Sequence, residues 1–441
     1  MPYLVHTDKD RSEMLETLGA SSISELFAEV PRSLLTGSFD LPDGQSELEV
    51  TRRLAELAGS NRIYPDRLCF RGAGVYRRFI PAAVAAVTSK PDFYSAYTPY
   101  QAEASQGTLE AIFEFQTMIS ELTGLAVANA SMYDGATALA EAAVMACAST
   151  GRSRVLVSGW LHPEYLEVLK TYAQGRGFHV EHQVPAGGRS LPGEIAQRAS
   201  DQIAAVVYQQ PNFLGAVEDA DAICQAAHAC GALAVAVVDP ISLALLQPPA
   251  ACGADVAVGE GQQLGMHASF GGPHVGFLAC SADLKRRIPG RLVGQAHDAQ
   301  GRRGFTLTLQ AREQHIRRAR ATSNICTNHS LCALAATAYL SYLGPQGLES
   351  VAQASLAAAH QLQRRLCALP GWSPLHDTPF LWEFVVNCPD PSALSRRLSD
   401  HGILGGMALE RWYPELDHAL LFCCTEVNDQ GAIDRILEVL T

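Results

Sequence analysis

Short apolar runs alternate with amphipathic stretches through the middle of the chain. The runs are rich in Val, Ile, Leu and Ala and are bounded by polar or glycine residues, a pattern typical of buried strands. Helical spacing of apolar residues fills most of the gaps between them. This alternation predicts a mainly parallel, doubly wound α/β sheet with helices on both faces. The expected strands lie at residues 125–128, 154–157, 179–184, 203–208, 233–238, 255–258 and 275–279.

The N-terminal part of the chain has a different pattern. It carries short helical signals, with Asp10 or Ser12 as one candidate cap and Ser22 with Glu25 as a capping box, but too few apolar positions for a core. We therefore expect a helical arm that lies on a larger body or on a partner. The expected domains are this arm (1–65), a large domain (66–330) and a smaller C-terminal α/β domain (331–441).

The C-terminal third is expected to be mostly helical at first. Beyond Cys280 the pattern predicts a basic helical segment and a polar helix over 312–320, followed by a long apolar helix over 330–343 that ends at Gly344. The small domain would then contain strands at 381–386 and 419–424 and helices at 393–401 and 429–440.

Composition narrows the class of protein. With 441 residues, 48% hydrophobic and 18% charged, the chain has the length for two domains and the balance of a globular protein. A net charge of −12 disfavours nucleic acid and anionic membranes as partners. The N-terminus has no apolar signal region and no stretch is apolar enough to span a bilayer, so we expect a cytoplasmic protein. The twelve cysteines show no metal-ligand spacing, as is typical of buried thiols in a reducing compartment.

Polar groups follow four of the expected strands, at turns that converge on one edge of the sheet. The first group precedes a small-residue helix, whose free N–H groups could cradle a phosphate. The second is a histidine that could stack on a flat ring, although a lone histidine there is more often simply hydrogen-bonded. The four turns carry Asp134, Gly135 and Ala136, then His162, then Asn212, then Asp239.

The stretch from 232 to 280 resembles the layout of a pyridoxal-phosphate enzyme. In such enzymes an acid that ends one strand, here Asp239, pairs with the pyridine nitrogen, and a lysine just past the next strand holds the cofactor. Aligning this stretch puts Gln263 at the lysine position. A glutamine amide cannot form an imine, and the four lysines of the chain lie elsewhere, at 9, 90, 170 and 285.

An aromatic and polar segment before residue 107 has little helical or strand periodicity. One interpretation is a surface loop that buries tyrosines for packing. The other is a pocket wall, because aromatic groups with polar tips suit half-buried ligand sites and interfaces. Its candidate residues are Tyr97, Tyr100, Gln101, Glu103, Ser105 and Gln106.

Long motifs along nearly the whole chain resemble the P-protein of the glycine cleavage system, and in particular the first subunit of its two-subunit form. One departure is Arg78, where that family more often has histidine. The motifs are DRSEMLETLGASSISELF, CFRGAGVYRRFIP, FYSAYTPYQAEASQG, SMYDGATALAEA, QQPNFLGAVED, VGEGQQLG and REQHIRRARATSNICTN.

The resemblance implies a fold type I pyridoxal-phosphate transferase, aminotransferase-like, assembled as a heterotetramer from two copies each of subunits 1 and 2. Such a complex decarboxylates glycine, releases carbon dioxide and passes the aminomethyl group to the lipoyl arm of the H-protein. The lysine and the cofactor belong to subunit 2 in that family. This chain alone would therefore hold no catalytic residue and no covalently bound cofactor, and we expect it to be inactive alone.

The resemblance also suggests roles for the candidate residues. Asp134, Gly135 and Ala136 match the phosphate loop, His162 the ring-stacking position and Asp239 the pyridinium acid, with Asn212 at the same edge; all would be relics. The aromatic segment would be lent to the partner's pocket across the interface. Two alternatives remain: a free-standing enzyme of the same fold, against which Gln263 argues, and a non-catalytic scaffold docking the H-protein, supported only by basic clusters at 285–287 and 317–320.

Overall fold

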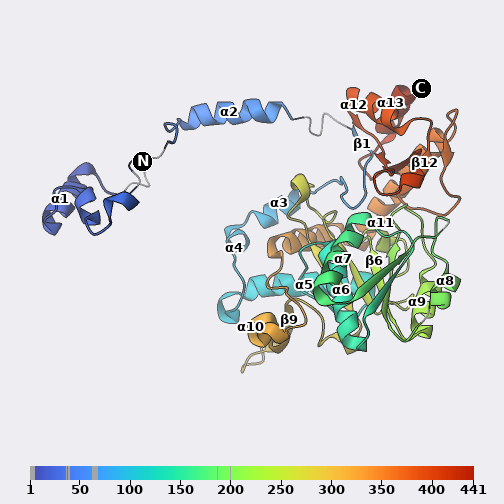
Figure 1. The fold of residues 1–441 in the computed structure, drawn as a ribbon, viewed down its shortest axis with the longest axis horizontal. Coiled ribbons are helices and arrows are strands. Elements are labelled where there is room, and N and C mark those ends of the chain that lie inside the picture. Colours follow the sequence, from blue (N-terminus) through green and yellow to red (C-terminus); the bar gives the residue numbers. More distant parts are fainter. Residues whose placement is uncertain (1–4, 36, 38–39, 62–67, 186, 199) are drawn as a thin grey trace. The chain divides into compact units, whose positions relative to one another are not determined.

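The computed structural model describes residues 5–35, 37, 40–61, 68–185, 187–198 and 200–441. They form two compact units, 1–63 and 64–441, which are described separately (Figure 1). The expected boundary between arm and body, at 65/66, lies outside the described residues. No helix in the described ranges is long and apolar enough to cross a membrane.

The first unit consists of short helices, of which α1 and α2 have side-chain caps at their N-termini. Thr7 caps the first helix and Asp10 is its capping-box partner, so neither Asp10 nor Ser12 is the cap itself. Ser22 makes no capping bond, because Glu25 pairs with Ser21 instead. None of the described residues of this unit is buried. Its elements are α1 (Asp8–Leu18), η1 (Ile23–Phe27), η2 (Arg32–Leu34) and α2 (Glu47–Gly59).

A seven-stranded sheet organises the second unit. Its pairs are parallel except those of β8, which runs antiparallel to both neighbours. The expected mainly parallel sheet is thus confirmed, with strand ends shifted by one or two residues. In sheet order the strands are β2 (Val127–Ala128), β8 (Gly276–Cys280), β7 (Val256–Glu260), β6 (Leu233–Val238), β5 (Ile203–Gln210), β3 (Arg154–Ser158) and β4 (His179–Gln183).

Helices cover both faces of this sheet, because successive residues of each strand point to opposite sides. In β5, Val206 packs in one core cluster while Val207 packs in the other. The cluster of Val207 includes residues of α6 and α7, and that of Val206 includes residues of α5, α9 and the later helix α11 (Figure 1). The flanking helices are α5 (Gln106–Thr123), α6 (Gly135–Thr150), α7 (Pro163–Arg176), α8 (Pro192–Arg198) and α9 (Ala220–Ala229).

The segment after Cys280 is not helical as expected. It forms an antiparallel hairpin of β9 (Leu292–His297) and β10 (Arg303–Thr308). Phe305 and Leu307 are buried while Thr306 between them is exposed, a period of two that the basic residues obscured in the sequence. The expected polar helix is three short turns, η7 (Gln310–Arg312), α10 (Gln314–Arg317) and η8 (Arg318–Arg320).

The remaining α-helices and strands described in the second unit are a long helix, a small antiparallel sheet, a strand pair and four shorter helices. Helix α11 (Ser330–Leu366) kinks at Gly344, where the expected helix ends. Strand β1 (Leu68–Cys69), the first of the second unit, pairs with β13 (Ile403–Leu404) of the C-terminal part. The expected boundary between a large and a small domain at 330/331 stays a prediction. An antiparallel sheet has the order β11 (Ser373–Pro374), β12 (Glu383–Asn387), β15 (Ala419–Cys423) and β14 (Met407–Ala408). The other helices are α3 (Ala82–Thr88), α4 (Pro91–Tyr94), α12 (Pro391–Asp400) and α13 (Gln430–Leu440).

Candidate functional site

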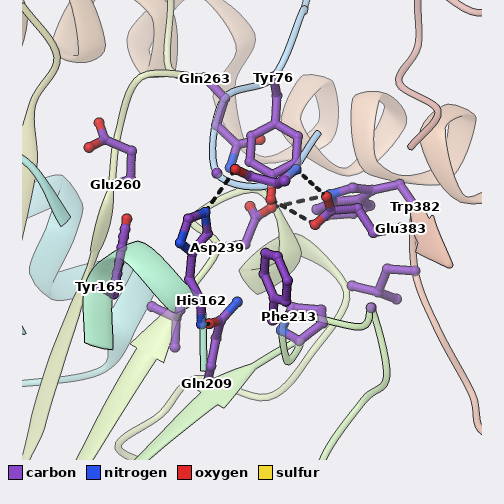
Figure 2. Close-up of a pocket in the computed structure, with 16 residues that line it drawn as sticks. Tyr76, His162, Tyr165, Gln209, Phe213, Asp239, Glu260, Gln263, Trp382 and Glu383 are labelled. Atoms are coloured by element: carbon purple, nitrogen blue, oxygen red, sulfur yellow. Dashed lines mark hydrogen bonds between the residues drawn. The ribbon is translucent and has the colours of Figure 1, made fainter. Parts of the chain in front are cut away.

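A small cavity lies at the carboxyl ends of the central strands, where the sheet turns were expected to converge. His162 and Asp239, from two of the four turns that were expected to converge, line it together with Gln263 (Figure 2). Its other side is formed by the loop at Ala73–Tyr76 and by Glu383 of β12. The cavity has a volume of about 50 Å³, room for a few water molecules.

Asp239 follows β6 and is held by donors on both carboxyl oxygens. The Ile241 N–H donates to Oδ1 at 2.8 Å, and the indole N–H of Trp382 donates to Oδ2 at 3.2 Å. Burial raises the pKa of Asp239, and the Arg78 guanidinium and a hydrogen bond with Gln263 act in the opposite direction. The acid expected at this strand end is therefore present, with partners that belong to the same chain.

Gln263, at the expected lysine position, bridges a cation and an acid. Its side-chain oxygen accepts a hydrogen bond from Arg78 Nε at 2.7 Å, while its side chain also hydrogen-bonds to Asp239. An amide serves this purpose because it carries both an acceptor and a donor. A lysine ammonium has no acceptor, so it could not take the Arg78 bond.

His162 begins α7 and is fixed at both ring nitrogens. Its Nδ1 accepts from the Glu164 N–H at 3.2 Å, which leaves Nε2 to donate to the Ala73 carbonyl at 2.9 Å. Burial lowers the pKa of His162, in keeping with this neutral tautomer. Its ring also lies 4.9 Å, centroid to centroid, from that of Phe213. The histidine is thus occupied by its own chain.

The N-terminus of α6, which the sequence marked as a possible phosphate cradle, is filled by a carboxyl group. Asp134 caps the helix by accepting from the Thr137 N–H at 2.7 Å, and Ala136 is buried behind it. The Gly135 N–H donates to Glu260 Oε2 at 3.0 Å. Glu260 was not expected from the sequence, although an acid between two glycines at the end of a strand was a usable signal.

Glu260 receives further donors on its other oxygen. Its Oε1 accepts from the Gln262 N–H at 2.9 Å and from the Val275 N–H at 3.3 Å. Burial raises the pKa of Glu260 to about 8, while the backbone donors act to lower it. Backbone N–H groups of this kind are what an anion at a helix N-terminus would use.

The loop before α3 is the second feature that sequence reasoning missed. Glu383 accepts from the Ala73 N–H at 2.6 Å and from the Tyr76 hydroxyl at 2.8 Å. The Tyr76 N–H donates to Gln262 Oε1 at 2.9 Å, and the Gln262 amide donates back to the Tyr76 carbonyl at 3.0 Å. The loop is therefore tied to the turn after β7 and, through Glu383, to β12 (Figure 2).

Asn212 takes a different place from the other turn residues. Its side-chain nitrogen donates to the Gly188 carbonyl and to Glu218, and its oxygen accepts from the Leu214 and Ala216 N–H groups. The described residues that line the cavity do not include it. The structure thus gives Asn212 a turn-stabilising position beside the site.

These residues do not fit pyridoxal phosphate. The lysine position holds Gln263, the anion cradle holds Glu260, and the Ala73 carbonyl covers the ring nitrogen of His162. The pocket has the outline of a cofactor site that is closed by the chain itself.

The aromatic segment lies away from this cavity, and none of the described lining residues comes from it. Tyr97 is 88% exposed, and Gln101 and Glu103 are exposed as well. Tyr100 accepts from Arg291 at 3.2 Å and lies under its guanidinium, while the Gln106 side chain pairs with the backbone of Phe305. Ser105 is half-buried at the start of α5. The anchors at Tyr100 and Gln106 thus lie on either side of the exposed Gln101 and Glu103.

Comparisons with known proteins agree along the whole chain. A family model described as "Glycine cleavage system P-protein" matches residues 1–440. A relative from Desulforamulus reducens, named "Probable glycine dehydrogenase (decarboxylating) subunit 1", is 49% identical over 99% of this chain and 98% of its own. A solved structure of glycine decarboxylase (P-protein) in inhibitor-bound form is 47% identical, with a TM-score of 0.91 over 100% of this chain and 99% of that one.

The architecture is shared more widely. An aspartate aminotransferase from Thermus thermophilus is 14% identical, with a TM-score of 0.58 over 85% of this chain and 97% of that one, a likeness that shows the fold alone. The fold is that of fold type I pyridoxal-phosphate transferases, as expected. On the family match and the identity over the full chain, this protein belongs to the P-protein family of the glycine cleavage system.

Proposed function

We propose that this chain is subunit 1 of a two-subunit glycine decarboxylase, glycine dehydrogenase (aminomethyl-transferring). In this proposal a second subunit carries the pyridoxal phosphate and its lysine. The assembled enzyme removes the carboxylate of glycine as carbon dioxide and passes the aminomethyl group to the lipoyl arm of the H-protein. The observation that carries the division of labour is Gln263, an amide engaged with Arg78 and Asp239 where an amine would be needed.

The share of this chain in the reaction would be a wall of the partner's pocket. Tyr97, Gln101 and Glu103 present a hydroxyl, an amide and a carboxylate on exposed side chains. The contacts of Tyr100 with Arg291 would hold that segment in shape, so the three side chains need little ordering when the subunits meet. Their work would be to exclude water and orient the substrate by hydrogen bonds.

The assembly would be a heterotetramer with two copies of each subunit. The first unit supports a role in this assembly, because its helices carry exposed apolar side chains such as Leu54 and Leu57, at 59% and 58%. A solitary helix with such a face gains stability by packing on another surface. We assign that surface to the second subunit.

The decisive experiment assays glycine-dependent exchange of labelled bicarbonate. It compares this chain alone, the second subunit alone, and both after co-expression, each supplied with pyridoxal phosphate and lipoylated H-protein. Exchange is expected only from the combination. Full-rate exchange by this chain alone would refute the division of labour, and full-rate exchange by the second subunit alone would remove this chain from the catalytic unit.

A further inference from the structure

The closed pocket at His162 and Asp239 raises the question of what keeps a cofactor out. We propose that this chain carries an internal ligand there: the Glu260 carboxyl takes the place of the phosphate, and the loop Ala73–Arg78 takes the place of the ring. Closure by these groups, in addition to the missing lysine, then excludes the cofactor. The proposal stands on contacts within one chain and does not depend on the activity of the assembled enzyme.

The carboxyl group of Glu260 satisfies the cradle as an anion would. It accepts from Gly135 at the start of α6 and from the backbone of Gln262 and Val275. The surroundings of Gly135 are tightly packed, because a Cβ there would lie 2.9 Å from the Glu260 nitrogen and would collide with the Tyr165 hydroxyl. A phosphate could enter only by displacing the carboxyl group.

The loop closes the other half of the pocket. Gly74 adopts φ +94°, and a Cβ there would lie 3.0 Å from His162 Nε2, so the backbone passes directly against the ring. Opening the loop would break the bonds of Ala73 and Tyr76 to Glu383 and leave that half-buried carboxyl without these two donors. The loop is therefore a fixed part of the fold.

Arg78 completes the closure from the end of the loop. Its side chain is 1% exposed, pairs with Glu426 at 2.7 Å and lies over the Trp382 ring at 5.1 Å from its centroid. Its Nε bonds Gln263, the position at which a cofactor lysine would stand. A lysine introduced at 263 would meet this guanidinium in place of a cofactor aldehyde.

The first test restores the lysine in the full chain, purified without its partner. Gln263→Lys is incubated with pyridoxal phosphate, reduced with borohydride and analysed by mass spectrometry for label at position 263. The loop still covers the ring position in both Gln263→Lys and Gln263→Lys/Glu260→Ala, so we expect less than a tenth of the stoichiometric label in either variant when both are folded by circular dichroism. Near-stoichiometric label in Gln263→Lys would overturn the proposal.

The second test introduces no lysine, so it tests the role of Glu260 even if the lysine variants do not fold. The melting temperatures of wild type and Glu260→Ala are measured in inorganic phosphate and in sodium chloride of equal ionic strength. We expect phosphate to raise the melting temperature of Glu260→Ala by several degrees and to leave wild type unchanged. Glu164→Ala is the matched control, since it removes an exposed acid from the start of the adjacent helix α7. A shift in wild type, or none in Glu260→Ala, would overturn the proposal.

Discussion

Arg78 is a buried cation, and its surroundings account for the guanidinium. The side chain binds Glu426, Ser355 and Gln263 at once and lies near Asp239. A guanidinium supplies several donors in fixed directions and keeps its charge when buried, which a histidine does not. Arg78 is thus a structural cation that compensates buried acids.

Glu383 should make the free energy of unfolding depend on pH. Burial raises its pKa from 4.5 to about 7, so the unfolded chain ionises first and the free energy of unfolding falls as the pH rises from about 4.5 to about 7. Glu383→Gln should flatten this fall by on the order of 2 kcal/mol, after allowance for its partial exposure. Urea unfolding at several pH values measures it.

Part of the fall in unfolding free energy with pH should remain in Glu383→Gln, because the pKa of Glu260 is also raised. Glu415→Gln, at an exposed position of the C-terminal part, is the control and should keep the wild-type slope. An unchanged slope in Glu383→Gln would show that this carboxyl group is not the source of the pH dependence.

If the exposed polar side chains of the aromatic segment line the partner's pocket, changing them should lower the exchange activity of the complex. Tyr97→Phe and Glu103→Gln each remove one polar function with little change in shape, so both should lower bicarbonate exchange by the complex by about tenfold or more. Assembly, followed by size-exclusion chromatography with light scattering, should stay intact. Tyr342→Phe, a tyrosine 64% exposed on α11, should exchange like wild type. Wild-type rates from both test variants would remove these residues from the partner's pocket.

At the scale of elements, the kink in α11 depends on the backbone conformation of one residue, Gly344. Gly344 has φ 60° and ψ −177°, a region that other residues adopt only with strain, and it lets the helix turn before Pro345. No other atom crowds the position, because a Cβ added to Gly344 would come no closer than 4.0 Å to its nearest neighbour, the Gln346 side chain. Any loss of stability from a side chain at this position would therefore come from backbone strain and not from a steric clash.

Gly344→Ala should lower the free energy of unfolding by about 1–3 kcal/mol. Gly175→Ala makes the same change inside α7, where the φ is ordinary and the space is open, and it should stabilise by about 0.5–1 kcal/mol. Thermal or urea unfolding of the two variants compares them directly. A neutral Gly344→Ala would mean that the kink is relaxed by a small local shift.

At the scale of the whole molecule, the first unit is a helical arm whose apolar side chains are exposed. Val50, Leu54 and Leu57 lie at helical spacing on one face of α2, with Arg52 and Glu56 on the other. If that face docks on the second subunit, Leu54→Ser/Leu57→Ser should weaken assembly about tenfold or more without changing the melting temperature of the body. Sedimentation velocity measures the assembly. Arg52→Ser/Glu56→Ser is the matched control, and equal assembly by both double variants would rule out this face.

Most of the second unit could be predicted from local pattern. The period of apolar residues marks strands such as β5 and β6, because a buried parallel strand must be apolar along its length. The same reasoning failed at β9 and β10, a hairpin of two six-residue strands in which buried and exposed residues are mixed. The turns at His162 and Asp239 were predicted to meet because parallel strands bring their carboxyl ends to one edge.

The sequence by itself determined the sheet, the acid at Asp239 and the amide at Gln263, since strand periodicity and residue identity are local properties. Only the tertiary structure decided that the pocket is closed. The groups that close it come from far apart in the chain, with Tyr76 bonded 186 residues away at Gln262 and Ala73 bonded 310 residues away at Glu383. Such contacts leave no period in the sequence, because they arise where irregular loops meet after the sheet has formed.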